Sequence, residues 1–461
     1  MENIKPNNVG TLRLRVTILT IVIFLQVINV LYFSFQKAGY HMDEYLTYSL
    51  SNYYHGVMLH WSNDFYSEWH EKDYFLGRLT PGEHTFSYNS VYYNQEKDVH
   101  PPLYYFIHHT FNSFFPNTFS KWIGILPNIS YFVTTTIFLY LLLCKLTKNY
   151  WLAILSCIVW GFSAGAISSV LFIRMYMLLT LFTLLNIYIH YHLVYTVKKT
   201  ALLWICTGLC TFLGFMTHYY YLVFAFFVSI LYLIYQLFLK KWKDIFIYTA
   251  IMSLSLGAGI LYFPASITHI FSSYRGEEAV SNLFNPNMFE KLKGSLEIVN
   301  RQLFAIHGKT LLILTIFFIL ISIFLRISIR LKDKIPTLEI TWFESRAIQL
   351  PITKDLIFTL SVIFVCMTYI GIISKIAPYI TDRYIFNTFP LIIMSLIIIA
   401  HYLFERFYKS MKIFFCFVLC IFILISMNSY RNGYVNYLFL GQNDRKEAIE
   451  GSGVSYAIYR R

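Results

Sequence analysis

Long apolar runs separated by short polar connections follow one another along most of this 461-residue chain. A run of about 17 to 25 apolar residues is long enough to cross the hydrocarbon core of a membrane as a helix. Such runs lie near residues 14–35, 123–144, 151–168, 172–195, 201–217, 220–239, 246–264, 309–328, 355–374, 384–404 and 413–429. They lack the two-residue alternation of membrane β-strands. The pattern therefore predicts an all-α fold, a polytopic transmembrane helical bundle.

Lysine and arginine in short connections predict the orientation of these helices, because positively charged loops stay in the cytoplasm. Lys5, Arg13 and Arg15 place the N-terminus inside. Basic residues likewise place inside the connections at 145–148, 198–199, 240–243, 326–354 and 406–412. Outside then lie a large first loop (36–100) with short interfacial helices, the stretch around Arg174, the turn at 217–221, a second loop (264–308), the turn at 375–383 and a short tail (431–461). Residues 1–430 form one transmembrane module.

One segment conflicts with this orientation. Residues 101–119 are apolar, yet a full crossing there would move Lys145 and everything after it to the wrong side. His108, His109 and Asn112 lie within it, which favours a short or re-entrant helix. An extra membrane crossing nearby, missed by the apolar-run pattern, would equally well return Lys145 and the later connections to their assigned sides.

Composition supports a membrane protein and excludes two other classes. The chain is 57% hydrophobic and 13% charged, whereas soluble domains are roughly a quarter charged. The net charge of +13 is spread over the inner connections, and no basic stripe indicates nucleic-acid binding. The seven cysteines all fall in or beside predicted spans, so neither a disulfide framework nor a cysteine-based metal site is indicated.

Two polar clusters mark a candidate site on the outer face. His41-Met42-Asp43-Glu44 follows the first span, and Asp98-Val99-His100-Pro101-Pro102 comes before the next apolar segment. The first loop is rich in acids, and Asp43 begins a run that is typical of a helix lying on the outer face. An aspartate at that position also suits helix capping, and Glu44 suits the helix dipole.

These clusters, with three further pieces, resemble the C-type (GT-C) integral-membrane glycosyltransferase superfamily, specifically its protein-mannosyltransferase-like branch. The further pieces are Arg174-Met175-Tyr176, Thr217-His218-Tyr219-Tyr220 and Asp382-Arg383-Tyr384-Ile385-Phe386, and together the pieces span residues 1 to about 430. The resemblance implies transfer of a sugar from a polyprenyl-phosphate carrier to an extracytoplasmic acceptor. Its members are enzymes of the cell membrane that act in cell-envelope glycosylation.

Transfer from a lipid phosphate needs a base for the acceptor's proton but no strong general acid, because phosphate is already a good leaving group. Glycoside hydrolysis differs, since two carboxylates flank the bond. We expect Asp43 to be the catalytic base, with Glu44 supporting it. Cations hold the charge of a leaving phosphate. The outer-face candidates for substrate or phosphate binding are Asp98, His100, Arg174, Tyr176, His218 and Arg383.

Structural roles remain open for each cation. Arg383 could be an interfacial anchor paired with Asp382, Arg174 could reach to the interface, and His218 could be an ordinary buried histidine. No cofactor is predicted with certainty. A divalent metal would find hard or borderline ligands in the two polar clusters, but their spacing matches no metal motif, so the metal stays unassigned.

Two rival functions share the predicted architecture. A lipid-linked polysaccharide polymerase or ligase also uses such donors, but it typically depends on large outer loops late in the chain. A lipid or sugar transporter would show inverted repeats and charges at mid-bilayer. The expected partners are therefore a polyprenyl-phosphate-linked sugar, an extracytoplasmic acceptor and the lipid bilayer, and no nucleic acid.

Overall fold

The computed structural model describes residues 6–56, 70–284, 287–308, 326–332, 335–341, 353–407, 411–441 and 456–457. Within them, eight helices are long and apolar enough to cross a membrane. They are α1 (Pro6–Gln36), α6 (Lys121–Thr147), α9 (Tyr176–Tyr195), α11 (Tyr220–Phe238), α12 (Trp242–Tyr262), α17 (Lys354–Ile376), α18 (Phe389–Phe407) and α19 (Met411–Arg431). The predicted multi-pass helical bundle is confirmed at this level.

Two predicted spans differ from simple helices. The run at 151–168 forms α7 (Tyr150–Gly161) and α8 (Ala164–Leu171), which meet at a bend of 57°. The Ser163 side chain accepts a hydrogen bond from the Ala166 backbone and so starts α8 anew. The run at 384–404 begins as two 3₁₀ turns, η2 (Asp382–Tyr384) and η3 (Phe386–Thr388). The run at 309–328 lies outside the described residues except for 326–328, which are strand.

The remaining apolar helix of the bundle is α10 (Ala201–Thr217), whose 17 residues match the predicted run. α9 and the α18 span are the most enclosed of the eight, each with 67% of its apolar window buried, whereas only 11% of the α12 window is buried. α12 therefore lies at the edge, and α9 lies in the core. Arg174 lies two residues before the start of this enclosed helix and is itself buried.

The segment at 101–119 does not cross the bundle. Its helix, α5 (Leu103–Ser113), has 11 residues and is about 16 Å long, roughly half a hydrocarbon core. Lys121 at the start of α6 donates to the carbonyl oxygens of Phe35 at 3.1 Å and Lys37 at 2.7 Å. The start of α6 therefore lies beside the end of α1, and everything between them begins and ends at one end of the bundle.

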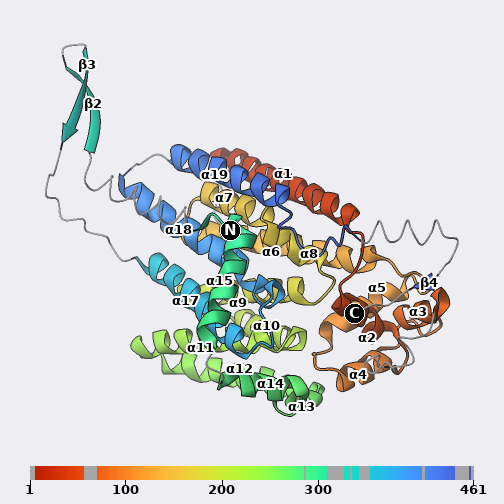
Figure 1. Cartoon of the computed structure of the whole chain (residues 1–461). Coiled ribbons are helices and arrows are strands. Elements are labelled where there is room, and N and C mark those ends of the chain that lie inside the picture. The colour runs from red at the N-terminus through yellow and green to blue at the C-terminus, as the bar shows by residue number, and fades with distance from the viewer. Residues whose placement is uncertain are drawn as a thin grey trace.

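Short helices fill the two loops predicted to lie outside. The first loop contains α2 (Met42–Asn52), α3 (Lys72–Leu79) and α4 (Tyr88–Lys97), and the second contains α13 (Ala265–Phe271), α14 (Tyr274–Leu283) and α15 (Met288–Phe304). Figure 1 shows α2 to α5 gathered at one end of the bundle, far from the β2–β3 hairpin.

Four short strands accompany the helical bundle within the described residues. β2 (Arg326–Lys332) pairs antiparallel with β3 (Ile335–Thr341) inside the predicted cytoplasmic loop, with Arg326 opposite Thr341. β1 (His70–Glu71) pairs antiparallel with β4 (Tyr456–Ala457). The apolar-run criterion detects helical spans and not such short strands, so the sequence pattern does not predict the β2–β3 pair.

Candidate functional site

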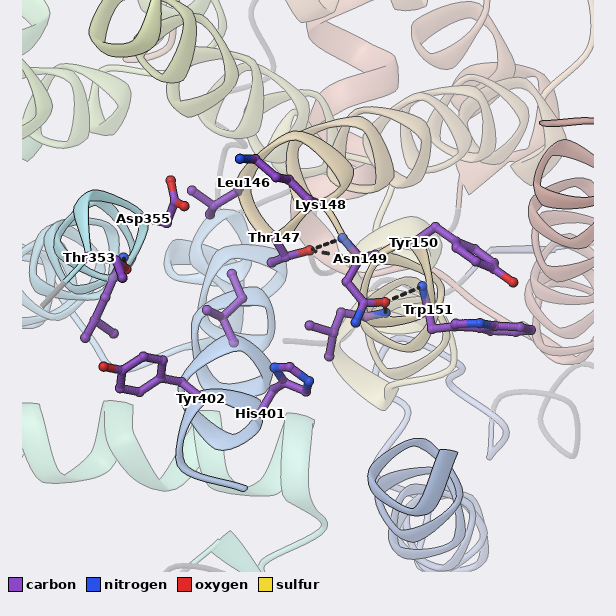
Figure 2. Close-up of a pocket in the computed structure, with 13 residues that line it drawn as sticks. Leu146, Thr147, Lys148, Asn149, Tyr150, Trp151, Thr353, Asp355, His401 and Tyr402 are labelled. Atoms are coloured by element: carbon purple, nitrogen blue, oxygen red, sulfur yellow. Dashed lines mark hydrogen bonds between the residues drawn. The ribbon is translucent and has the colours of Figure 1, made fainter. Parts of the chain in front are cut away.

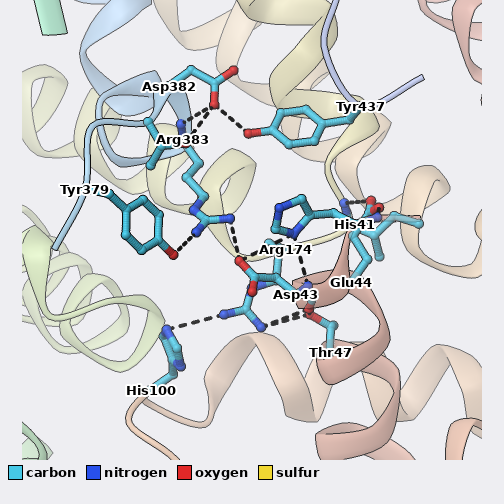
Figure 3. A network of polar contacts seen from close by, with 12 residues as sticks. His41, Asp43, Glu44, Thr47, His100, Arg174, Tyr379, Asp382, Arg383 and Tyr437 are labelled. Carbon is cyan, nitrogen blue, oxygen red and sulfur yellow. Dashed lines mark hydrogen bonds and ion pairs between the residues drawn. The ribbon is translucent and has the colours of Figure 1, made fainter. Parts of the chain in front are cut away.

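Predicted site residues from distant parts of the chain lie close together, and Figure 3 shows Asp43, Glu44, His100, Arg174 and Arg383 among them. Asp43 pairs with Arg383, and Arg174 contacts both the Asp43 backbone and His100. The Tyr176 and His218 rings lie 5.5 Å apart, and the Tyr384 ring next to Arg383 lies 6.2 Å from Tyr176. Asp98 joins the group through His100.

An ion pair between Asp43 and Arg383 is the centre of the cluster. Their side chains approach to 2.5 Å, and they are 22% and 4% exposed. Burial by itself would raise the pKa of Asp43, but the nearby charges of Arg174 and Arg383 outweigh it and hold that pKa below its usual value. Asp43 is therefore ionised at neutral pH and lies where two guanidinium groups converge.

Asp43 is not the cap of α2. That helix begins at Met42, and the cap is His41, whose Nδ1 accepts the Asp43 backbone N–H at 3.1 Å. Glu44 completes a capping box, because its Oε2 accepts the His41 backbone N–H at 2.6 Å. The capping alternative for Asp43 is therefore wrong, and its carboxylate is left to face Arg383.

Glu44 lies behind the site in the protein interior. Its carboxylate is fully buried and accepts from Lys37 Nζ at 3.0 Å and from the Ile173 backbone N–H at 2.8 Å, in addition to His41. Burial raises the pKa of Glu44 and lowers the pKa of Lys37, so each depends on the other for its charge. These contacts are those of a residue that positions the start of α2 against the turn before α9.

Arg174 points into the cluster, contrary to the interfacial alternative. It is only 3% exposed, and its Nη1 donates to the Asp43 carbonyl and to Thr47 Oγ1, both at 3.2 Å. The turn that carries it is held by Asn128, whose amide donates to the carbonyl oxygens of Val170 and Phe172 at the end of α8. This turn is therefore built by polar contacts within the apolar core.

His100 links an acid to this arginine. Its Nδ1 lies 2.7 Å from Asp98 Oδ2, and its Nε2 lies 3.3 Å from Arg174 Nη2. Burial would raise the pKa of Asp98, but His100 and Arg174 lower it below its usual value. Asp98 is therefore an ionised group that orients the imidazole, in the way that a carboxylate commonly fixes a functional histidine.

His218 lies against the same group of rings. Its Nδ1 accepts the Tyr220 backbone N–H at 3.0 Å, and its ring centroid is 5.9 Å from that of His100. Burial, and then the charges of His100, Arg174 and Arg383, lower the pKa of His218 well below its usual value. The imidazole is therefore neutral, with its proton on Nε2. His218 is therefore a buried histidine whose Nδ1 has a hydrogen-bond partner, and it also lies beside the candidate site.

Arg383 does not pair with Asp382, as the anchor alternative required. Its guanidinium contacts Asp43 and the Tyr379 hydroxyl, and its Nε finds no hydrogen-bond partner among the described residues. The Asp382 carboxylate instead accepts from the Tyr437 hydroxyl at 2.5 Å and the Asn436 amide at 2.6 Å.

A pocket of about 490 Å³ opens beside Arg383. Its lining residues come from the start of α2, the turn before η2 and the tail: His41, Tyr379, Ile380, Thr381, Arg383, Asn436, Tyr437 and Phe439. A second pocket, of about 550 Å³, is lined by the connection between α6 and α7 and by parts of α17 and α18, including Lys148, Asp355 and His401 (Figure 2). The Arg383 guanidinium gives the first pocket a group suited to an anion.

Sequence reasoning missed Lys37, Tyr379, Asn436 and Tyr437. Lys37 carries a signal, since a lysine seven residues before Glu44 directly follows the first span. The tail residues carry none, because nothing local relates them to Asp382. Among the described residues, no three His, Cys, Asp or Glu side chains gather to hold a metal ion.

Compared with known proteins, the chain matches no protein-family profile, no curated protein and no solved structure. The likeness to the GT-C superfamily therefore stays a prediction from the sequence motifs.

Proposed function

We propose that this protein is a membrane glycosyltransferase that moves a sugar from a polyprenyl-phosphate-linked donor to an acceptor on the extracytoplasmic face of the cell membrane. The observation that carries the proposal is the convergence of Asp43, Arg383 and Arg174 next to a pocket at one end of an apolar helical bundle. One carboxylate and two guanidinium groups are what the transfer requires: a proton acceptor and counter-charges for phosphate.

In the proposed reaction, the acceptor hydroxyl attacks the anomeric carbon of the donor sugar. The bond from that carbon to the phosphate oxygen breaks, and the phosphate leaves with the electron pair. Asp43 takes the proton of the hydroxyl. Arg383 and Arg174 hold the charge on the leaving phosphate, and His100, oriented by Asp98, supports Arg174. Glu44 acts through the fold rather than on substrate.

Because Asp43 is paired with Arg383, binding of the donor can change the basicity of Asp43. A bound phosphate competes with Asp43 for the Arg383 guanidinium. As that contact weakens, the pKa of Asp43 rises toward the value that burial favours. A carboxylate with a higher pKa is the stronger base, so Asp43 gains basicity when the donor is in place.

The placement of charge favours this proposal over a transporter. Transporters bind substrate near the bilayer midplane, whereas Asp43, Asp98, Arg174 and Arg383 gather at one end of the bundle. A polymerase or ligase acting on lipid-linked glycans is a related alternative, and it would differ from the proposal in its acceptor.

Donor consumption by purified, reconstituted protein tests the proposal. Radiolabelled polyprenyl-phosphate hexoses are supplied with an extract of cell-envelope acceptors, and wild type is compared with Asp43→Asn and Arg383→Ala. We expect Asp43→Asn to lower consumption about 10²- to 10⁴-fold, the usual contribution of a general base. Asp244→Asn is the matched control, because Asp244 pairs with Lys199 away from the site.

Undiminished consumption in Asp43→Asn would contradict the assignment of the base. Growth of the product by repeated transfer of lipid-linked oligosaccharides would instead identify the polymerase alternative.

A further inference from the structure

The segment at 434–439, which follows α19, has a constrained backbone within the site. Tyr437 has φ +68° and Phe439 has φ +52°. Bulky residues rarely adopt this left-handed conformation. Such conformations persist where the surroundings over-determine them, and they concentrate at functional sites. We call residues 434–439 the tail segment.

Contacts from three parts of the bundle fix the tail segment. At the end of α1, Lys37 Nζ donates to the Tyr437 carbonyl and the Ala38 backbone N–H donates to the Leu438 carbonyl, both at 2.8 Å. From α8, Ser168 Oγ accepts the Asn436 backbone N–H at 2.9 Å. From α15, Gln302 donates to the Tyr434 carbonyl at 3.2 Å. The tail segment is therefore an integral part of the site's wall.

The tail segment reaches Arg383 through Asp382. The Tyr437 hydroxyl and the Asn436 amide both donate to the Asp382 carboxylate, which also accepts the Arg383 backbone N–H at 2.8 Å. The Tyr437 ring stacks on Phe172, with centroids 4.2 Å apart, and the Arg383 guanidinium lies 5.7 Å from the same Phe172 ring. The hydroxyl group of Tyr437 thus fixes the backbone of η2, and its ring supports the surface over which the guanidinium lies.

We propose that the tail segment positions Arg383 through Asp382 and thereby sets the affinity of the site for the phosphate of its lipid-linked substrate. Tyr437 and Asp382 are positioning residues. The inference rests on the proposed function only in naming a lipid phosphate as the ligand of Arg383. It gives a role to residues that the sequence motifs leave out.

Carbodiimide labelling of Asp43 tests the positioning without any substrate. Carbodiimides react with protonated carboxyl groups, so Asp43 is protected while Arg383 holds it ionised. At one mildly acidic pH, mass spectrometry follows labelling of Asp43 in Tyr437→Phe, Asp382→Asn and Arg383→Ala. We expect at least a threefold faster rate in Tyr437→Phe and Asp382→Asn, approaching that of Arg383→Ala. Tyr434→Phe, the same change in the same segment away from Asp382, keeps the wild-type rate.

Labelling of Asp98 in the same samples separates positioning from general loosening of the fold, because Asp98 pairs with His100 and no hydrogen bond or ion pair among the described residues joins it to the tail segment. A wild-type labelling rate for Asp43 in Tyr437→Phe would overturn the inference. An unchanged labelling rate of Asp43 in all variants, Arg383→Ala included, would also overturn the inference. It would show that the ion pair between Asp43 and Arg383, through which the tail segment acts, is absent.

The affinity of each variant for a sugar-free polyprenyl monophosphate tests whether the tail segment affects phosphate binding. We expect at least fivefold weaker binding in Tyr437→Phe and none of this loss in Tyr434→Phe. Equal affinity of Tyr437→Phe and wild type would overturn the inference about the tail segment but would leave the proposed function standing. A wild-type protein that does not bind polyprenyl phosphate would contradict the proposed function, while the labelling result would still decide whether the tail segment positions Arg383.

Discussion

Two neighbouring acids, Asp43 and Glu44, have opposite surroundings. Successive residues of a helix point about 100° apart, so one carboxylate at the start of α2 faces the pocket side and the next faces the interior. Asp43 is partly exposed and meets Arg383, whereas Glu44 is fully buried and meets Lys37. Adjacent residues of one chemical type therefore have separate tasks.

The buried pair of Glu44 and Lys37 contributes to the stability of the fold. Replacing Glu44 with Gln leaves the Lys37 charge without its partner, which costs about 3 kcal/mol in buried pairs of this kind. We expect a clear fall in the melting temperature of the purified protein. The double variant Lys37→Met/Glu44→Gln should recover part of it, because it removes both charges.

Thermal unfolding with turnover measured in parallel checks this expectation. A Glu44→Gln protein as stable as wild type but without activity would show that Glu44 works in catalysis, as the sequence alone predicts.

At the scale of elements, α5 shows how a short helix can be apolar without spanning the membrane. Its buried face carries His108 and His109. His109 Nδ1 lies 3.2 Å from Asn52 Oδ1, and His108 Nδ1 lies 3.0 Å from Asn112 Nδ2. Burial lowers the pKa of His108 to about 3 and that of His109 to about 4. Both imidazoles are therefore neutral in the folded protein near neutral pH.

This neutrality predicts a loss of stability in acid. Between pH about 6.5 and about 4, the unfolded chain binds protons on these histidines and the folded protein does not. Stability therefore falls as the pH falls through this range. We expect the variant His108→Gln/His109→Gln to show a smaller drop in melting temperature over it than wild type.

Melting curves measured across that pH range test the point. Substitution of the exposed His84 by Gln is the control. An unchanged pH dependence in the double variant would contradict the burial of α5.

The elements that the sequence predicts best are the long spans, because lipid requires continuous apolar helices whatever their neighbours are. The sequence predicts their breaks less well. The bend between α7 and α8 depends on a serine cap, and the start of α18 depends on contacts of Asp382 with the tail. Both features depend on contacts between polar groups, which the mean hydropathy of a segment does not reveal.

At the scale of the whole molecule, α2 to α5 of the first predicted outer loop gather at one end of the bundle (Figure 1). The hydrogen bond from Lys121 to the Phe35 carbonyl places the start of α6 beside the end of α1, so α5 adds no crossing between them and the conflict at 101–119 is removed. The structure itself leaves the absolute orientation to the charge rule.

Cysteine labelling gives that orientation. We expect Glu83→Cys and Asn117→Cys, which lie before and after α5, to react with a membrane-impermeant maleimide added outside intact cells. Lys198→Cys, in the connection between α9 and α10, should react only after the membrane is opened.

Wild-type protein measures the background from the native cysteines, of which Cys416 and Cys420 are exposed on the apolar α19. Labelling of residues 83 and 117 from opposite sides would show that α5 crosses the membrane.

The sequence by itself determined the class of the protein, most of its spans and the residues Asp43, His100, Arg174, His218 and Arg383 that gather at one end. These follow from local physics. A lipid environment requires continuous apolar runs, and ionisable groups close to the membrane are costly and therefore mark candidate functional sites. Only the tertiary structure decided which charges pair. Arg383 meets Asp43 rather than its neighbour Asp382, and Tyr437 meets Asp382. Such pairings depend on distances across the folded bundle, where partners far apart in the chain compete with neighbouring residues.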